Sequence, residues 1–274
     1  ARQYFSDITA YTYGYRDGGE PWSEDVSYAE RLADFLGIGL RLVPASAHDV
    51  DEAVEPALCY GQDWRDFNVH CAVVNEILAG AMKRDLAESP NGPPPLVMTG
   101  DLMNEFLADY TPISYRGREY YTLPKLEPDR LRLTLIRGLD AGDREIGIFN
   151  RHGLDILQPY GCLLDPYLNV PSALTGQPEA KQLLVREIAG DLLPAFALER
   201  PKVRAQIGSS KETTGILPLF VRSGRDATWL KKAFCDFFMV SDPRLLNQFI
   251  RAGVYRFASE FPKEVKTDHG YFTR

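Results

Sequence analysis

The chain has 274 residues, of which 45% are hydrophobic and 25% are charged, a balance typical of globular proteins with a large core. This composition excludes disordered and fibrous proteins. No uncharged apolar run reaches about 18 residues, and the first residues lack the cationic start and apolar stretch of a secretory signal. We therefore expect a cytoplasmic protein that neither spans nor binds a membrane.

The charge balance is acidic, with 31 Lys and Arg residues against 38 Asp and Glu residues and a net charge of −7. This sign is wrong for broad binding to nucleic acid or anionic lipid, although a local basic pocket can still bind a small anion. We expect no nucleic-acid partner.

Cysteine and histidine usage also limits the chemistry. The four cysteines, Cys59, Cys71, Cys162 and Cys235, form neither a CxxC motif nor a Cys/His cluster, which disfavours zinc and a disulfide framework. We interpret them as reduced thiols, mostly in the core. Only four histidines occur and no GxSxG motif accompanies them, so a Ser/His hydrolase is disfavoured.

The first elements follow a strand–helix–strand pattern. Residues Ile8–Tyr15 are β-branched and aromatic, which predicts a buried strand. A helix is predicted next, with Ser23 as its N-cap and Gly37 as its end. The apolar run Leu40–Val43 predicts a second strand, and this order within about 45 residues is typical of a parallel α/β sheet.

The next helix is predicted over Cys71–Leu86, and the proline-rich loop after it ends the helix. The strand Leu96–Thr99 then leads directly into Gly100 and Asp101. A carboxylate is therefore expected at the carboxyl end of a parallel strand, where open α/β sheets bind ligands.

The second half is mainly helical in period after an irregular aromatic stretch that follows Tyr110. One apolar stripe contains Ala180, Leu183, Leu184 and Ile188. Another contains Trp229, Leu230, Ala233, Phe234, Phe237 and Phe238. With no repeats and no long linker, we expect one domain over 1–274, with an α/β core at 1–110 and a mainly helical lobe at 111–274.

Four segments, in order, resemble the synthetase domain of the asparagine synthetase and β-lactam synthetase family. Residues 11–38 resemble its second strand and following helix, and residues 97–110 (VMTGDLMNEFLADY) resemble its SGDGADELFGGY-like turn. Residues 160–174 resemble its PFLD segment, and residues 180–210 resemble its K-x-LLR, LLP and RPK stretch. The resemblance implies a parallel α/β sheet of the adenine-nucleotide α-hydrolase-like (ATP pyrophosphatase) type.

The family adenylates a carboxylate with ATP and Mg²⁺, releases pyrophosphate, and joins the acyl group to an amine. The resemblance thus implies an AMP-forming carbon–nitrogen ligase whose partners are a small amino-acid-like or peptide carboxylate and an amine. A ring-forming lactam synthetase is an alternative, and the departures from SGDGADE favour specialised metabolism over a housekeeping enzyme. An N-terminal or separate amidotransferase-like part and a homodimer both remain open.

Cations must hold a triphosphate that carries roughly four negative charges. By resemblance, Lys181 holds pyrophosphate and Lys202 contacts both phosphate and the charge developing on the acyl centre. Backbone N–H groups of Gly208, Ser209 and Ser210 would line the pocket as an anion nest. The alternative is that both lysines are ordinary solvated surface groups.

The turn at 100–105 carries the second set of implied roles. Gly100 would adjoin ATP, and Asp101 would orient or deprotonate the amine. Asn104 and Glu105 occupy the family's DE-like pair that binds Mg²⁺, although an amide carbonyl is a weaker ligand than the usual carboxylate. The alternative for Asp101 is a helix N-cap.

Two further assignments follow from the resemblance. Glu145 lies roughly where β-lactam synthetases place a Glu that partners a tyrosine as general base; the alternative is a surface carboxylate. Tyr13, Gly14 and Tyr15 lie where the family's backbone recognises adenine, and a glycine there allows close approach of the base. Core packing is the alternative for both tyrosines.

The family's first strand and SGGxDS pyrophosphate loop do not occur in this sequence. We expect a fragment whose loop, with any amidotransferase-like domain, is lost or on another chain, because strand Ile8–Tyr15 otherwise needs a substitute neighbour. A protein that never had the loop is the alternative. A non-catalytic binding or scaffold subunit therefore stays open, while other ATP pyrophosphatases, such as thiolation enzymes, are disfavoured by the absence of CxxC.

Overall fold

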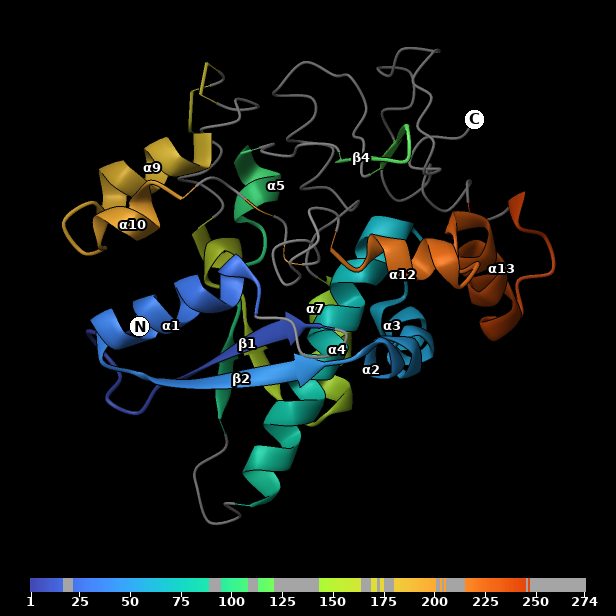
Figure 1. Ribbon diagram of the computed structural model, residues 1–274, viewed down its shortest axis with the longest axis horizontal. Coiled ribbons are helices and arrows are strands. Elements are labelled where there is room, and N and C mark those ends of the chain that lie inside the picture. Colours follow the sequence, from blue (N-terminus) through green and yellow to red (C-terminus); the bar gives the residue numbers. More distant parts are fainter. Residues whose placement is uncertain are drawn as a thin grey trace.

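The computed structural model is an α/β protein in which helices surround short parallel strands (Figure 1). The residues that the structure describes are 1–16, 22–88, 95–107, 113–120, 143–163, 169–171, 173–174, 180–200, 203, 205, 215–244 and 246.

The chain opens with the predicted strand–helix–strand unit. Strand β1 (Thr9–Tyr15), helix α1 (Glu24–Leu36) and strand β2 (Gly39–Ala45) follow one another, and β1 pairs in parallel with β2 along its whole length. The prediction of a parallel unit in this region is confirmed. Its carboxyl edge, the edge at which parallel strands present their following loops, ends at Tyr15 and Ala45.

Both predicted ends of α1 are also confirmed. Ser23 occupies the N-cap position with extended backbone, and its side chain makes no capping bond. Gly37 ends the helix in the left-handed region with φ 61°, which costs glycine little because it has no Cβ. Acidic Glu24 and Asp25 lie in the first turn, where the helix dipole favours negative charge.

Three helices follow β2: α2 (Ala47–Glu52), α3 (Val54–Gly61) and α4 (Asp66–Ala87). Helix α4 begins earlier than the predicted start at Cys71. The acidic Asp66 lies in its first turn and Val69 is buried there, so both the dipole and the core favour the longer helix.

The second parallel pair joins β3 (Leu96–Met98) to β6 (Asp155–Leu157). The sequence predicts one parallel sheet, whereas in the described part of the chain no ladder joins β3 and β6 to β1 and β2. Strand β6 was not predicted, because three residues are too few to show a period.

An antiparallel hairpin lies within the stretch predicted to be irregular. Strands β4 (Ile113–Tyr115) and β5 (Arg118–Tyr120) are joined by Arg116 and Gly117, both at positive φ (50° and 76°). A two-residue type I′ turn requires positive φ at both central residues, and its twist matches that of the flanking strands. Arg116 and Gly117 meet this requirement, which explains why a hairpin forms here.

Helices dominate the described part of the second half, as predicted. They are α9 (Ala180–Ala189), α10 (Ala195–Leu198), α12 (Leu217–Arg222) and α13 (Ala227–Phe237), preceded by α7 (Asp143–Arg151). In Figure 1, α9 and α10 lie beside α1, whereas α12 and α13 lie at the other side of the molecule near α3.

Two groups of buried side chains correspond to this division. The larger one joins β1, α3, α4, α7, α12 and α13, with Ile148 and Phe149 of α7 almost fully buried. The smaller one packs helix α5 (Met103–Leu107) against the start of α9 through Leu107 and Ala180. None of the helices within the described ranges is long and apolar enough to cross a membrane.

Candidate functional site

The turn after β3 is the strongest candidate for a site. The backbone N–H of Thr99 donates to Leu157 O at 3.1 Å, so the β3–β6 pairing continues to the start of this turn. Gly100 and Asp101 follow at once, with Gly100 exposed and Asp101 half-buried. The predicted carboxylate therefore lies at the carboxyl end of a parallel strand, the edge where ligands bind in open α/β sheets.

This turn is held in a strained backbone conformation. Leu102 has φ 77° and is 9% exposed, although a bulky side chain disfavours the left-handed region. Such a residue costs about 1–3 kcal/mol and persists only where its surroundings hold it. The 3₁₀ helix η2 (Pro159–Leu163) provides that packing, because a Cβ at its Gly161 would be 2.8 Å from Leu102 Cδ1.

Two polar atoms in the same turn lack hydrogen-bond partners among the described residues. They are Thr99 Oγ1 and Asn104 Oδ1, both inaccessible to solvent. An unsatisfied buried polar atom costs about 1–3 kcal/mol, so a donor or cation from outside the described residues would stabilise each of these oxygens. Strain and unsatisfied oxygens together are typical of a ligand site.

Asp101 lies two residues before the start of α5 at Met103. The N-cap position therefore falls on Leu102, and Asp101 precedes it by one residue. Asp101 is half-buried there, three residues after the end of β3 at Met98.

The three predicted adenine-site residues form the end of β1. Tyr13 is 4% exposed and Tyr15 is 7% exposed, and both belong to the main core, which agrees with the core-packing alternative. Burial raises the pKa of the Tyr13 hydroxyl, whose oxygen has no hydrogen-bond partner in the described chain.

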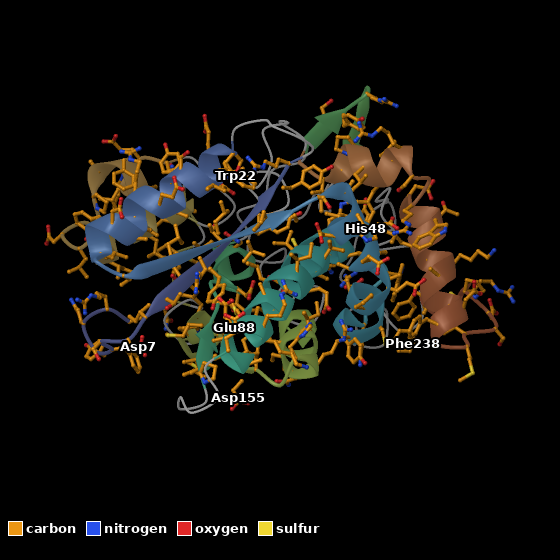
Figure 2. The ribbon with its side chains drawn as sticks, turned by 60° about the horizontal axis from the view of Figure 1, so that its bottom comes forward. Asp7, Trp22, His48, Glu88, Asp155 and Phe238 are labelled. Atoms are coloured by element: carbon orange, nitrogen blue, oxygen red, sulfur yellow. The ribbon has the colours of Figure 1, made fainter. Side chains whose placement is uncertain are left out.

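Gly14, the third of these residues, is covered by an indole ring. A Cβ at Gly14 would be 2.9 Å from Cε3 of Trp22, and the Arg16 guanidinium stacks on that ring at 3.7 Å from its centroid. Figure 2 shows Trp22 at the start of α1. A base that approached Gly14 from this side would have to displace the indole.

Glu145 lies in the first turn of α7 and is fully buried. Its Oε1 accepts a hydrogen bond from Asn75 Nδ2 of α4 at 3.2 Å. The alternative that Glu145 is a surface carboxylate is therefore wrong. Its contact is with the α4 helix, away from bulk solvent.

The lysines and the anion nest are only partly described. Lys181 is the second residue of α9, and its side chain lies outside the described residues, as does that of Glu105 in α5. Lys202 lies outside them entirely. The same holds for the predicted nest of Gly208, Ser209 and Ser210.

One contact, made by Arg200, was missed by sequence reasoning. The Arg200 guanidinium forms an ion pair with Asp25 Oδ1 of α1 and stacks on the Tyr28 ring at 4.3 Å from its centroid. Burial lowers the pKa of Arg200, an effect that the charge of Glu24 opposes, and the group stays protonated. The sequence offered only one signal, the acidic pair in the first turn of α1.

A second charged cluster lies on α4 and α7. Glu76 Oε1 accepts hydrogen bonds from Arg151 and contacts His152 Nε2 at 3.0 Å. Arg151 is the last residue of α7 and His152 follows it, just before β6 begins at Asp155. This cluster therefore lies at the amino end of β6, opposite the end that adjoins the strained turn. We assign it to the α4–α7 interface rather than to the candidate site.

Within the described ranges, no three His, Cys, Asp or Glu side chains are grouped so that they could hold a metal ion. All four cysteines are free thiols. A scan against models of protein families finds no match to this chain, and a search of curated proteins finds none either.

Proposed function

We propose that the protein is an ATP-dependent, AMP-forming synthetase that adenylates a carboxylate and transfers the acyl group to an amine. The observation that carries the proposal is the turn after β3, where Leu102 is strained and Asp101 is half-buried. In the same turn, Thr99 Oγ1 and Asn104 Oδ1 have no hydrogen-bond partner among the described residues. Sequence resemblance in four ordered segments supports the same reaction.

The residues present fit Mg²⁺ only in a site where the phosphates of the bound nucleotide supply the remaining ligands. Magnesium usually takes one or two protein oxygens together with substrate phosphates. The buried Asn104 Oδ1 has no partner among the described residues and offers one such oxygen, and Glu105 is the adjacent carboxylate. When bound, Mg²⁺ would neutralise charge on the triphosphate and its leaving pyrophosphate.

The remaining roles belong to side chains of this chain. Asp101 would hold the attacking amine at the strand end and accept its proton. Lys181 and Lys202 would bind the phosphates, with Lys202 also next to the reacting acyl group. The acyl-adenylate intermediate would need protection from hydrolysis by water. The carboxylate and amine substrates would be amino-acid-like or peptide molecules.

The test measures AMP and pyrophosphate released from ATP and Mg²⁺ with panels of amino acids, peptides and amines. We expect wild type to release both, and Lys202→Ala to release them at a rate lower by about 100-fold or more. The matched control is Lys232→Ala, at an exposed lysine on α13, which keeps the wild-type rate. No release with any substrate, or equal rates for Lys202→Ala and wild type, would contradict the proposal.

Product analysis separates the two kinds of synthetase. An intermolecular ligase needs a separate amine, and its product contains both molecules. A lactam-forming enzyme turns over a single substrate and yields a product that has lost one water. The mass of the product therefore decides between them.

A non-catalytic binding subunit is a second candidate, favoured by the indole that covers Gly14 and by the neutral Asn104. Calorimetry with ATP and Mg²⁺ discriminates. Binding without release of AMP under any substrate condition would support a binding subunit, whereas AMP release would exclude it.

A further inference from the structure

Gly161 of η2 lies against the strained turn at Leu102. A Cβ at Gly161 would be 2.8 Å from Leu102 Cδ1, closer than real Cβ atoms approach a neighbour. The φ of Gly161 lies outside the left-handed region, so alanine can adopt the same backbone. The lack of a Cβ at residue 161 therefore allows the contact with Leu102 and is not required by the backbone of η2 itself.

Leu102 is held from more than one side. Its φ of 77° brings the Cβ of an ordinary residue too close to the following carbonyl oxygen, so the surroundings must stabilise this conformation. Its side chain is 9% exposed and belongs to the smaller group of buried side chains, between α5 and the start of α9. Tyr160, the residue before Gly161, packs against the same group. Rotation of the Leu102 side chain away from Gly161 would thus meet packed neighbours.

The segment that carries Gly161 also holds the other end of the turn. The carbonyl of Leu157, the last residue of β6, accepts a hydrogen bond from the Thr99 N–H at 3.1 Å, and η2 begins two residues later. One continuous segment therefore contacts the turn at Thr99 and at Leu102, with Asp101 between the two contacts. We name this pair of contacts, Leu157 with Thr99 and Gly161 with Leu102, the turn brace.

The turn brace restricts the position of Asp101. Consecutive Cα atoms are about 3.8 Å apart, so Asp101 Cα lies within about 7.6 Å of Thr99 Cα and next to Leu102. If Leu102 returned to negative φ, the chain between Asp101 and α5 would change direction. Asn104 depends less on this contact, because it lies within α5 and Leu107 packs that helix against α9.

We propose that Gly161 is a positioning residue, which acts through Leu102 to hold Asp101 where it receives the proton of the attacking amine. This inference rests on the proposed function, in which Asp101 acts in amide formation. In that step the amine nitrogen forms a bond to the acyl carbon, the bond from the acyl carbon to the phosphate oxygen breaks and releases AMP, and a proton of the amine passes to the Asp101 carboxylate. Adenylation of the carboxylate precedes this step and uses other residues. Loss of the brace should therefore slow amide formation and leave adenylation at its wild-type rate.

The first experiment needs no nucleotide. Hydrogen exchange is measured over the peptide 97–103 in wild type and in Gly161→Ala, with the folding of each protein checked by circular dichroism. We expect exchange in this peptide to rise about tenfold in Gly161→Ala, because the turn opens locally more often when one of its two contacts is lost. Cys162→Ala, at the exposed next residue of η2, is the matched control and leaves the peptide unchanged. Equal exchange in Gly161→Ala and wild type would overturn the brace.

Leu102→Ala breaks the same contact from the turn side, and it replaces Gly161→Ala if that variant does not fold. Alone it should also raise the exchange of the peptide about tenfold. With both substitutions together, the exchange should be no faster than in the faster single variant, because both changes remove one contact. Additive effects would show that the two residues act independently and would overturn the brace.

The second experiment measures the two steps of the reaction separately. Exchange of labelled pyrophosphate into ATP reports adenylation, and amide product reports the whole reaction, with the carboxylate and amine identified in the panels of amino acids, peptides and amines. We expect Gly161→Ala to lower the rate of product formation about 10- to 100-fold and to keep pyrophosphate exchange within about twofold of wild type. Asp101→Asn should show the same pattern, since it removes the carboxylate that accepts the proton. Cys162→Ala should match wild type in both assays.

The outcomes separate the failure of the positioning role from that of the proposed function. If wild type exchanges no pyrophosphate and forms no product, the proposed function fails and the positioning role fails with it. If wild type is active and Gly161→Ala forms product at the wild-type rate, the positioning role alone is overturned. Equal losses in pyrophosphate exchange and product formation would assign Gly161 a purely structural role, which also overturns the positioning role.

Discussion

Trp22 lies over Gly14 so closely that any Cβ at this position of β1 would meet the indole at 2.9 Å. The same Cβ would lie 3.2 Å from Leu42 Cδ1 of β2. The Arg16 guanidinium also stacks on this ring. The Trp22 indole therefore covers the end of β1, and it can lie this close only because residue 14 is a glycine without a Cβ.

Replacement of Gly14 by alanine tests this packing. We expect Gly14→Ala to lower the free energy of unfolding by about 1–3 kcal/mol, because the core at this point is already full. Gly39→Ala in β2 is the matched control, since its nearest heavy atom would be 3.5 Å away, at ordinary contact distance. Urea denaturation measures both, and similar stabilities for the two variants would contradict the close packing of Trp22.

Gly147 is a second position where backbone approach requires glycine. A Cβ there would be 2.1 Å from the carbonyl oxygen of Tyr60 in α3, which is backbone and has little room to move. We expect Gly147→Ala to destabilise the protein by about 3 kcal/mol or more. Thermal and urea unfolding give the measurement.

Gly80 of α4 is the control for this change, because it too lies inside a helix. Its Cβ would meet side-chain atoms only at 3.6 Å or beyond. Gly80→Ala should raise the free energy of unfolding by about 0.5–1 kcal/mol, through helix propensity alone. A Gly147→Ala variant as stable as Gly80→Ala would show that α3 and α7 do not approach as described.

Because the pKa of the Tyr11 hydroxyl is raised in the folded protein, we expect the free energy of unfolding to fall at high pH. Desolvation first, and then the hydrogen bond that it donates to Asp85 at 2.8 Å, raise its pKa from 10.0 to about 12. The folded protein thus keeps a proton that the unfolded chain loses between these values, so this contribution is complete below pH 10 and disappears as the pH rises toward 12. Tyr11→Phe should reduce the fall in urea midpoint over this range.

Tyr4 provides the control for the pH experiment, because its side chain is 83% exposed. Tyr4→Phe should leave the slope of stability against pH as in wild type. If Tyr11→Phe also leaves the slope unchanged, the bond between Tyr11 and Asp85 contributes nothing to the pH dependence.

The Ser46 capping box predicts a smaller effect at acidic pH. Ser46 Oγ accepts from the Asp49 N–H, and the Asp49 carboxylate accepts from both the hydroxyl and the N–H of Ser46, which lowers the pKa of Asp49. Ser46→Ala should cost about 1 kcal/mol at neutral pH. The cost should shrink as the pH falls through the lowered pKa of Asp49, because the contribution of an acid with a depressed pKa is lost there.

Ser27→Ala, at an exposed helical position, is the control and should change stability little at any pH. A cost for Ser46→Ala that stays constant between neutral and strongly acidic pH would show that Asp49 does not take part in the cap.

Local signals in the sequence predicted the first parallel unit well. The β-branched and aromatic run of β1 and the capping residues of α1 act within a few residues of where they lie, so their effects can be read directly. Of the second parallel pair, the sequence predicted β3 but not β6. Strand β6 has only three residues, and its pairing with β3 depends on contacts between residues far apart in the chain.

The candidate site shows the same limit. The sequence predicted Asp101 at a strand end, but the left-handed backbone of Leu102 depends on close packing against Gly161 of η2, a residue far along the chain. The pair of Asp25 and Arg200 joins residues far apart in the chain, and neither residue type by itself indicates the other.

Calorimetry with ATP and Mg²⁺ on wild type and Asn104→Ala tests most directly whether nucleotide and Mg²⁺ bind at the turn after β3. Asn150→Ala, at an exposed position of α7, is the matched control. We predict that wild type and Asn150→Ala bind ATP with Mg²⁺ alike. Asn104→Ala should bind at least about tenfold more weakly, because it removes the side-chain oxygen proposed as a Mg²⁺ ligand. Equal binding by all three proteins, or none by wild type, would contradict a nucleotide and Mg²⁺ site at this turn.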